Sequence, residues 1–253
     1  MRRDHPEAEA WLELLEAALA EGEPGGDWDA AVPKPPGDRP ANAPFLYRAQ
    51  FAVNRRAAGS WVHCIAGRDV DAVALLEAAV CQEDARIEAL AAAAGVDPEA
   101  LRVTAQLAGV PLLQACGRAF AAQVAPTWWE GYCPVCGAWP TLAESIGLER
   151  KRQLRCGRCG TAWALPPLRC VFCGEVGHDQ LGYLAPDEAE PVRRVEICRT
   201  CNGYLKALTT MRSLAPWAVL LDDLTTVHLD VVALERGYRR PERPGYALEA
   251  RLA

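Results

Sequence analysis

The segment Cys133-Pro-Val-Cys136 opens a run of four Cys-x-x-Cys pairs that decides the fold of this 253-residue chain. Because two sulfurs from one tight turn make half of a tetrahedral thiolate site, four such pairs predict two closed metal sites. Gaps of 19, 10 and 24 residues separate the pairs. The other three pairs are Cys156-Gly-Arg-Cys159, Cys170-Val-Phe-Cys173 and Cys198-Arg-Thr-Cys201.

The residue that follows each pair supports this prediction. A metal-binding turn, here called a knuckle, bends at that residue into a left-handed conformation, which glycine and asparagine tolerate best. Backbone N–H groups then point at the sulfurs and stabilise their negative charge. A lone Cys-x-x-Cys pair is also typical of thioredoxin-like redox proteins, but those need a strand–helix setting that this sequence does not predict. The four following residues are Gly137, Gly160, Gly174 and Asn202.

We expect the pairs to combine in chain order, because short connections are the rule. The first site would then use Cys133, Cys136, Cys156 and Cys159, and the second Cys170, Cys173, Cys198 and Cys201. The opening pairs are 37 residues apart and the closing pairs 42, which indicates a repeated unit with a longer loop in the second copy. An interleaved combination of the first pair with the third stays open. The identity of the metal also stays open, because tetrahedral thiolate sites accept both zinc and iron.

The eleven cysteines are unusual for the compartment that the rest of the sequence indicates. The start MRRDHPEAEAW has no apolar stretch like that of a signal peptide, and no apolar run reaches the roughly 20 residues that span a bilayer. We therefore expect a cytoplasmic protein without membrane insertion. Disulfides are rare in the cytoplasm, so the cysteines need another explanation. The three cysteines outside the pairs, Cys64, Cys81 and Cys116, lie in expected helices, and we predict that they are buried in the core.

The net charge of −6 is unevenly distributed. Residues 1–132 carry 11 basic and 19 acidic side chains, which argues against nucleic-acid binding, since that needs a basic face. Five basic residues between Arg150 and Arg158 form a local exception. We interpret them as a solvated hairpin between knuckles, and a docking patch for an acidic partner is the alternative.

The first 130 residues predict a helical bundle, since Ala and Leu are abundant and β-branched alternation is rare. Asp97-Pro98 is typical of a helix start. Near the C-terminus, we expect Asp222 or Asp223 to cap a last helix that ends at Gly237. The expected helices cover about 6–21, 45–66, 69–94, 98–108 and 111–124, with a Pro- and Gly-rich loop over 22–44.

These patterns predict an α+β protein in three parts. The first is an N-terminal helical bundle, residues 1–130. The second is a four-cysteine metal module, residues 131–168. The third is a second four-cysteine module with a C-terminal helix, residues 169–253.

Five runs together resemble the formate dehydrogenase accessory protein FdhE family, over about residues 125–241. They are CPVCGAWPTLA (133–143), LRCGRCGTAW (154–163), LRCVFCG (168–174), EICRTCNGYLK (196–206) and LLDDLTTVHLDVVALERGY (220–238). The resemblance implies two rubredoxin-like or zinc-ribbon-like modules in which the eight paired cysteines bind two metal ions, iron or zinc. It also implies a cytoplasmic protein that assists maturation of formate dehydrogenase by binding the immature catalytic subunit.

We do not expect this chain to be an enzyme. It has no Gly-rich phosphate loop, no nucleophile elbow and no His-Glu-x-x-His sequence. The alternative function is that of a rubredoxin-like iron electron-transfer protein, because a four-thiolate iron can carry one electron. A homodimer is left open.

Overall fold

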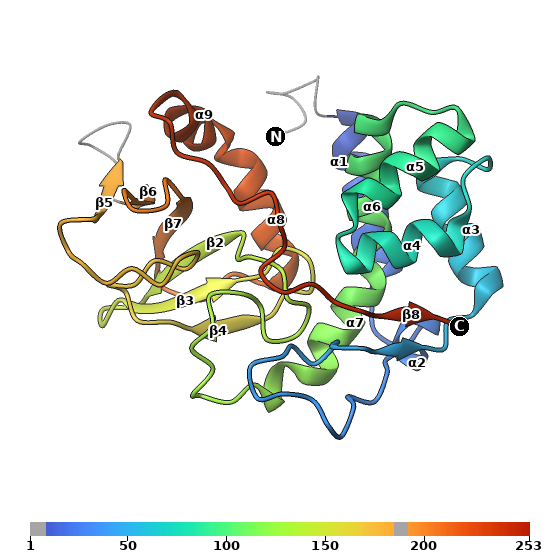
Figure 1. Ribbon diagram of the computed structural model, residues 1–253, viewed down its shortest axis with the longest axis horizontal. Coiled ribbons are helices and arrows are strands. Elements are labelled where there is room, and N and C mark those ends of the chain that lie inside the picture. Colours follow the sequence, from blue (N-terminus) through green and yellow to red (C-terminus); the bar gives the residue numbers. More distant parts are fainter. Residues whose placement is uncertain (1–8, 185–191) are drawn as a thin grey trace. The chain divides into compact units, whose positions relative to one another are not determined.

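The computed structural model describes residues 9–184 and 192–253, and it divides into two compact units (Figure 1). The helical unit comprises the described residues up to Arg39, Phe45–Ala119 and Ala247–Ala253. The sheet unit comprises Pro40–Pro44 and the described residues of Phe120–Tyr246. The predicted α+β fold, with N-terminal helices and two four-cysteine clusters, is confirmed.

The helical unit packs its helices around a leucine-rich core. Leu15, Leu75, Leu76, Leu112 and Leu113 are almost completely buried. The helices are α1 (Glu9–Glu21), α2 (Asp27–Ala30), α3 (Arg55–Ala66), α4 (Ala72–Cys81), α5 (Asp84–Ala94), α6 (Pro98–Ala108) and α7 (Val110–Phe120), followed by the 3-10 turn η2 (Ala121–Gln123). The expected helices at 98–108 and 111–124 are confirmed, apart from the 3-10 ending of the latter.

Capping side chains fix three of these helix starts. Asn54, Asp71 and Asp97 each accept a hydrogen bond from a backbone N–H in the first turn of α3, α4 and α6, respectively. The cap at Asn54 corrects the expected helix over 45–66, because α3 begins only at Arg55. The residues before it include the short strand β1 (Gln50–Phe51), whose parallel partner β8 (Arg251–Leu252) lies at the other end of the sequence.

Two further expectations about this unit are wrong in detail. The helix expected over 69–94 is split, because Gln82 adopts a left-handed backbone conformation (φ 59°) that ends α4 before α5 begins. The loop expected over 22–44 contains the short helix α2, which buries Trp28. Of the three cysteines expected in the core, Cys81 and Cys116 are buried, but Cys64 is exposed on α3.

The sheet unit is built on one six-stranded sheet with the strand order β4-β3-β2-β7-β6-β5. Neighbouring strands are antiparallel except β2 and β7, which are parallel. The strands are β2 (Leu142–Ile146), β3 (Lys151–Arg155), β4 (Ala162–Ala164), β5 (Leu181–Leu184), β6 (Arg193–Cys198) and β7 (Tyr204–Thr210).

The strand order reveals a tandem repeat. Each copy runs knuckle, strand, strand, knuckle, strand, and the parallel pairing of β2 with β7 joins the two copies edge to edge. Residues 131–168 and 169–253 therefore contribute to the same sheet, while Ala247–Ala253 return to the helical unit. The longer loop expected in the second copy connects β5 with β6, and its residues 185–191 lie outside the described part of the chain.

Two helices pack on one face of this sheet. Val219 of α8 (Pro216–Thr225) contacts Leu142 and Leu208, and Leu229 of α9 (Val227–Glu235) belongs to a cluster with Val195. The expectation that Asp222 or Asp223 caps a helix is wrong, since both lie in the last turns of α8.

Among the helices of residues 9–184 and 192–253, none combines the length and the apolar character that crossing a membrane requires.

Candidate metal centres

The four knuckles share one backbone geometry, which the pattern of following residues predicts. Gly137, Gly160, Gly174 and Asn202 all have positive φ angles, between 53° and 78°. In the first three knuckles, the N–H of the glycine donates a hydrogen bond of 2.9–3.1 Å to the carbonyl of the first cysteine. The N–H of each first cysteine in turn donates to the carbonyl of the residue five positions later, at 2.8–3.0 Å. Each Cys-x-x-Cys pair is thus closed into a tight turn.

The structure brings the cysteines together in two groups of four, combined in chain order. Within each group all four Sγ atoms lie within 4.8 Å of one another. In the first group the Cys133–Cys159 and Cys136–Cys156 sulfurs are 3.4 and 3.5 Å apart. In the second group the corresponding sulfur distances are both 3.7 Å, between Cys170 and Cys201 and between Cys173 and Cys198. The interleaved combination is thereby excluded.

These distances fit a metal ion and not disulfides. Sulfurs in a disulfide are about 2.05 Å apart, and all eight cysteines are free thiols. A tetrahedral ion with metal–sulfur bonds of about 2.3 Å holds its sulfurs about 3.8 Å apart, close to the observed 3.7 Å. The donor set of four thiolates is the one that zinc and iron accept.

In the first group, burial makes ionised thiols costly at Cys133 and Cys159. Desolvation raises the pKa of the Cys133 and Cys159 thiols well above their ordinary value. In the second group, burial raises the pKa of Cys170 to about 11. A bound cation offsets this cost, because it replaces the proton and attracts all four sulfurs.

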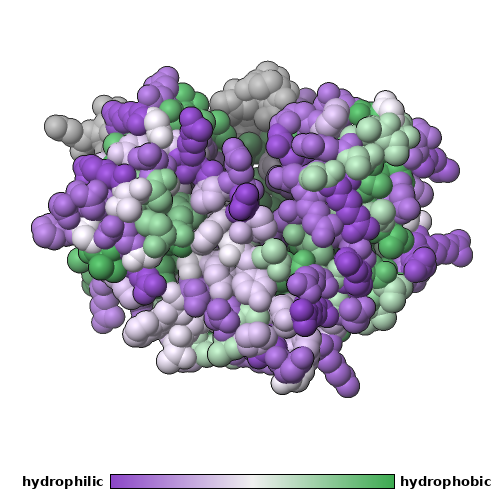
Figure 2. Space-filling view, viewed as in Figure 1, coloured by the Kyte–Doolittle hydropathy of each residue, from purple (hydrophilic) through white to green (hydrophobic). Residues whose placement is uncertain are grey.

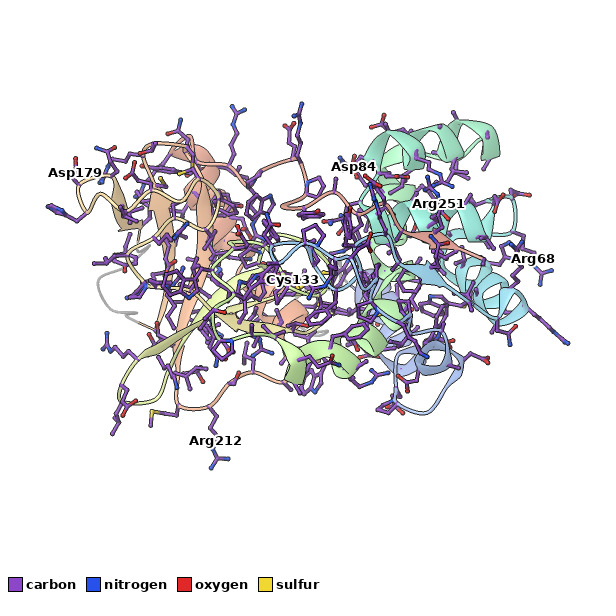
Figure 3. The ribbon with its side chains drawn as sticks, turned by 60° about the horizontal axis from the view of Figure 1, so that its bottom comes forward. Arg68, Asp84, Cys133, Asp179, Arg212 and Arg251 are labelled. Atoms are coloured by element: carbon purple, nitrogen blue, oxygen red, sulfur yellow. The ribbon has the colours of Figure 1, made fainter. Side chains whose placement is uncertain are left out.

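The first group is enclosed. All four of its cysteine residues are buried, and Cys133 is labelled in Figure 3. A methyl group added at Gly160 would meet Pro216 of α8 at 2.6 Å, and one at Gly137 would meet the Tyr246 carbonyl at 2.8 Å. Neighbouring segments therefore pack directly on both knuckles of this site.

The second group is half open. Cys170 and Cys198 are buried, whereas Cys173 and Cys201 are exposed. A methyl group at Gly174 would find its nearest neighbour, the Arg169 guanidinium, only at 3.6 Å. In Figure 3 Asp179, in the loop after the third knuckle, lies at the outer edge of the molecule.

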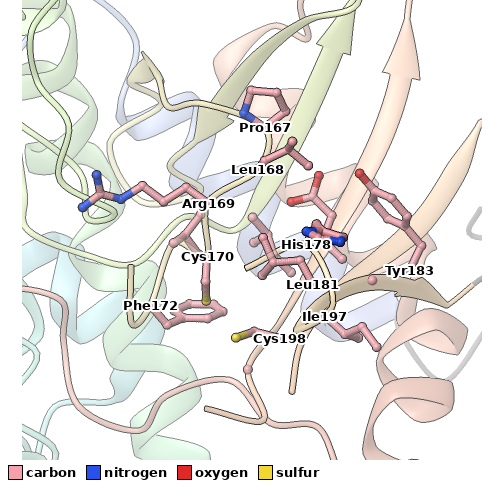
Figure 4. Close-up of a pocket in the computed structure, with 15 residues that line it drawn as sticks. Pro167, Leu168, Arg169, Cys170, Phe172, His178, Leu181, Tyr183, Ile197 and Cys198 are labelled. Carbon is pink, nitrogen blue, oxygen red and sulfur yellow. The ribbon is translucent and has the colours of Figure 1, made fainter. Parts of the chain in front are cut away.

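A pocket of about 230 Å³ borders the second group (Figure 4). Cys170 and Cys198 form part of its wall, next to the Phe172 ring. Leu181 and Tyr183 of the edge strand β5 line the opposite side. A second hollow of about 220 Å³ reaches Cys170 and Cys173 from the other side of Phe172.

Each copy contains a second, closing knuckle, and the residue just before this closing knuckle differs between the two copies. In the first copy, Arg155 precedes Cys156 and forms a buried ion pair with Glu144 at 2.8 Å. Glu144 also accepts hydrogen bonds from the Ser213 hydroxyl and the Leu214 N–H, so the segment before α8 is tied to the sheet. In the second copy, the apolar Ile197 precedes Cys198 and packs under α9.

The basic stretch at 150–158 belongs to the expected hairpin, formed by β2 and β3, but of its basic residues only Arg150 and Lys151 at the tip are exposed. Arg152 and Arg155 are buried, at 7% and 2% exposure. The Arg152 guanidinium lies 2.6 Å from Glu196 of β6 and so ties the first copy to the second. Because buried charges need partners, these arginines hold the sheet together and do not form a free docking patch.

A polar cluster that the sequence did not predict fixes α8 and α9 on the sheet. The buried Lys206 of β7 lies 2.6 Å from Asp223 and 2.7 Å from Asp230. Arg240 also pairs with both carboxylates, and Tyr204 donates a hydrogen bond to Asp230. The two adjacent acidic residues Asp222 and Asp223 could have indicated this cluster from the sequence, but their role is ion pairing and not capping.

Comparison with known proteins confirms the resemblance noted in the sequence. Residues 168–244 match the family described as "FdhE, C-terminal domain". A protein named "Protein FdhE homolog" from Aquifex aeolicus (strain VF5) is 34% identical over 119 residues, which are 46% of this chain and 41% of that protein. "Protein FdhE" from Escherichia coli O127:H6 is 33% identical over 111 residues, 43% of this chain and 35% of its own length. The matched segments thus span less than half of these relatives.

A solved structure covers more of the chain. The crystal structure of the FdhE protein from Pseudomonas aeruginosa matches 93% of both chains with a TM-score of 0.50, at 24% sequence identity. At this identity the match supports the fold, including the helical unit, and carries nothing further about activity.

Proposed function

Because residues 168–244 carry the FdhE C-terminal domain, we propose that this chain is a cytoplasmic accessory protein for formate dehydrogenase maturation. In this proposal it binds the immature catalytic subunit, has no catalytic activity of its own, and does not bind nucleic acid. The observation that carries the proposal is the match of this domain together with two complete four-cysteine groups. The partner itself is inferred from the family resemblance.

The eight paired cysteines are proposed to bind two metal ions per chain, iron or zinc. The ligand set is Cys133, Cys136, Cys156 and Cys159 for one ion, and Cys170, Cys173, Cys198 and Cys201 for the other. The enclosed first group offers no open coordination position, which is typical of structural sites. Modules of this size bury little apolar surface, so metal binding would supply part of their folding energy.

The partner proposal is tested by co-purification. The tagged chain is used to capture the formate dehydrogenase catalytic subunit from cells of its native host that express it. We expect the catalytic subunit to be retained, and formate dehydrogenase activity to fall when the chain is deleted. Failure to retain the subunit, together with normal formate dehydrogenase activity after deletion, would contradict the proposal.

The second candidate function is rubredoxin-like electron transfer. The exposed Cys173 and Cys201 favour it, because a redox partner can approach an ion held at the second group. The test is the colour of protein purified without oxygen from its native cell. Visible thiolate-to-iron absorption that bleaches on reduction would support electron transfer, and colourless protein with two zinc ions would contradict it.

A further inference from the structure

The two cysteine groups differ in how far their cysteine residues are buried. All four cysteines of the first group are buried, whereas Cys173 and Cys201 of the second are exposed. Each exposed cysteine is the second cysteine of its knuckle. An incoming molecule can therefore approach the second group at two cysteine residues, while the other two stay buried.

The surroundings of the groups show the same difference. Pro216 and Leu220 of α8 pack on the second knuckle, at 2.6 and 3.0 Å from methyl groups added at Gly160 and Gly157. Beside the second group lie the two hollows of about 230 and 220 Å³, and Cys170 borders both of them. The face of the molecule in Figure 2 shows apolar residues among predominantly hydrophilic ones.

Access decides whether a closed thiolate site exchanges its ligands. A tetrahedral ion can expand to five ligands, so an entering ligand can bind before a resident one leaves. The entering ligand needs a path to the ion and a resident sulfur that can move into solvent. The second group has a bordering pocket and two exposed cysteines, whereas all four cysteines of the first group are buried.

We propose that the second four-cysteine group is a ligand-exchange site that accepts small-molecule thiols, while the first is a fixed structural site. The proposal rests on metal binding by both groups. With an ion held there, the sulfur of an entering thiol would replace the Cys173 or Cys201 sulfur as a ligand. The proton of the entering thiol would pass to the displaced cysteine sulfur, with no change in the oxidation state of the metal. The second group can thus release or hand on its ion, whereas the first cannot.

The experiment uses the full chain loaded with two zinc ions per molecule. Zinc release is followed with a coloured chelator at increasing glutathione concentrations. We expect the zinc to leave in two phases of one ion each. The fast phase should be at least about tenfold faster than the slow one, which is the scale on which the surroundings of a ligand change metal affinity. The rate of the fast phase should rise with glutathione, and that of the slow phase should not.

Variants assign the two phases. Cys173→Ser should remove the fast phase and leave the slow one. Cys64→Ser is the matched control, because Cys64 is exposed on α3 in the helical unit and belongs to neither group, so both phases should remain. Mass spectrometry of the zinc-loaded chain after alkylation gives a second assignment, with Cys173 and Cys201 modified before Cys133 and Cys136.

The outcomes separate this inference from the metal-binding proposal. A chain that binds fewer than two zinc ions would contradict metal binding by both groups and, with it, the exchange site. Two ions that leave at the same rate, or a fast phase that survives Cys173→Ser, would contradict the exchange site alone.

Discussion

Arg155 precedes the closing knuckle of the first site, whereas Ile197 precedes that of the second, although the two copies share one order of knuckles and strands. Arg155 is committed to a buried ion pair with Glu144, which also binds the segment before α8. α8 then covers the first site. Ile197 packs under α9, and Cys173 and Cys201 of the second site are exposed. The comparison teaches that the same four-thiolate unit becomes closed or open according to what is packed on its knuckles.

The largest effect is expected from opening the closed site. Cys133→Ala removes one of four buried ligands, so the chain should bind one metal ion instead of two. Structural zinc contributes roughly 10 kcal/mol or more of apparent folding free energy, so residues 131–168 should lose protease resistance. The helical unit should keep its resistance, because all of its residues lie outside this module. Limited proteolysis with metal analysis measures both, and an unchanged metal count or simultaneous cleavage of both units would be contrary results.

The next effect tests the ion pair beneath the first site. Glu144→Ala leaves the Arg155 guanidinium buried without its carboxylate partner, and such losses cost about 3–5 kcal/mol. Ile197→Val, at the position before the other closing knuckle, should cost only about 1 kcal/mol. Urea unfolding of the metal-loaded variants compares them. Equal costs for the two variants would show that the ion pair does not hold α8 over the first site.

A pair of glycine substitutions measures the enclosure directly. Alanine costs about 1–2 kcal/mol at either knuckle because of the left-handed backbone. Gly160→Ala should cost a further ~1–3 kcal/mol, because its methyl group would lie 2.6 Å from Pro216, whereas Gly174→Ala meets nothing closer than 3.6 Å. The midpoints of thermal unfolding give the difference. A Gly174→Ala variant as unstable as Gly160→Ala would mean that the second site is enclosed as well.

The smallest effect is expected from a change at Glu77, which tests how the helical unit, as distinct from the metal sites, responds to acid. Burial alone would raise the pKa of Glu77, but the Leu252 N–H and Arg86 outweigh it and lower the pKa below its ordinary 4.5. Ionised Glu77 therefore contributes to the stability of the folded state above about pH 4.5. This contribution is lost as the pH falls through the lower pKa that Glu77 has in the folded state. Glu77→Gln should remove about 1 kcal/mol of it at neutral pH. Hydrogen exchange of the Leu252 amide between pH 6 and 3 is the measurement, and the same pH dependence in both proteins would refute the assignment.

The sequence was sufficient for the features that depend on local chemistry. Four Cys-x-x-Cys pairs and the glycine or asparagine after each predict the knuckles, their left-handed residues and the two groups, because a knuckle is complete within about six residues. The sequence was insufficient for features that depend on contacts between segments far apart in the chain. Nothing near Arg155 indicates that its partner Glu144 is buried, and nothing in Arg251–Leu252 indicates pairing with Gln50–Phe51.

The helix boundaries failed for a related reason. A left-handed Gln82 and a cap at Asn54 both depend on packing that composition alone does not reveal. The exposure of Cys173 and Cys201 was likewise hidden, since all four pairs look alike in sequence. The difference between the two sites comes from α8, α9 and the pocket beside β5, which only the fold brings to the knuckles.

X-ray absorption at the metal edge, on protein purified anaerobically from its native host, tests the central claim that eight thiolates hold two ions. Together with metal analysis, we expect two ions per chain, each surrounded by four sulfurs at about 2.3 Å and by no nitrogen or oxygen. One ion per chain, or a first shell that contains nitrogen or oxygen ligands, would contradict it.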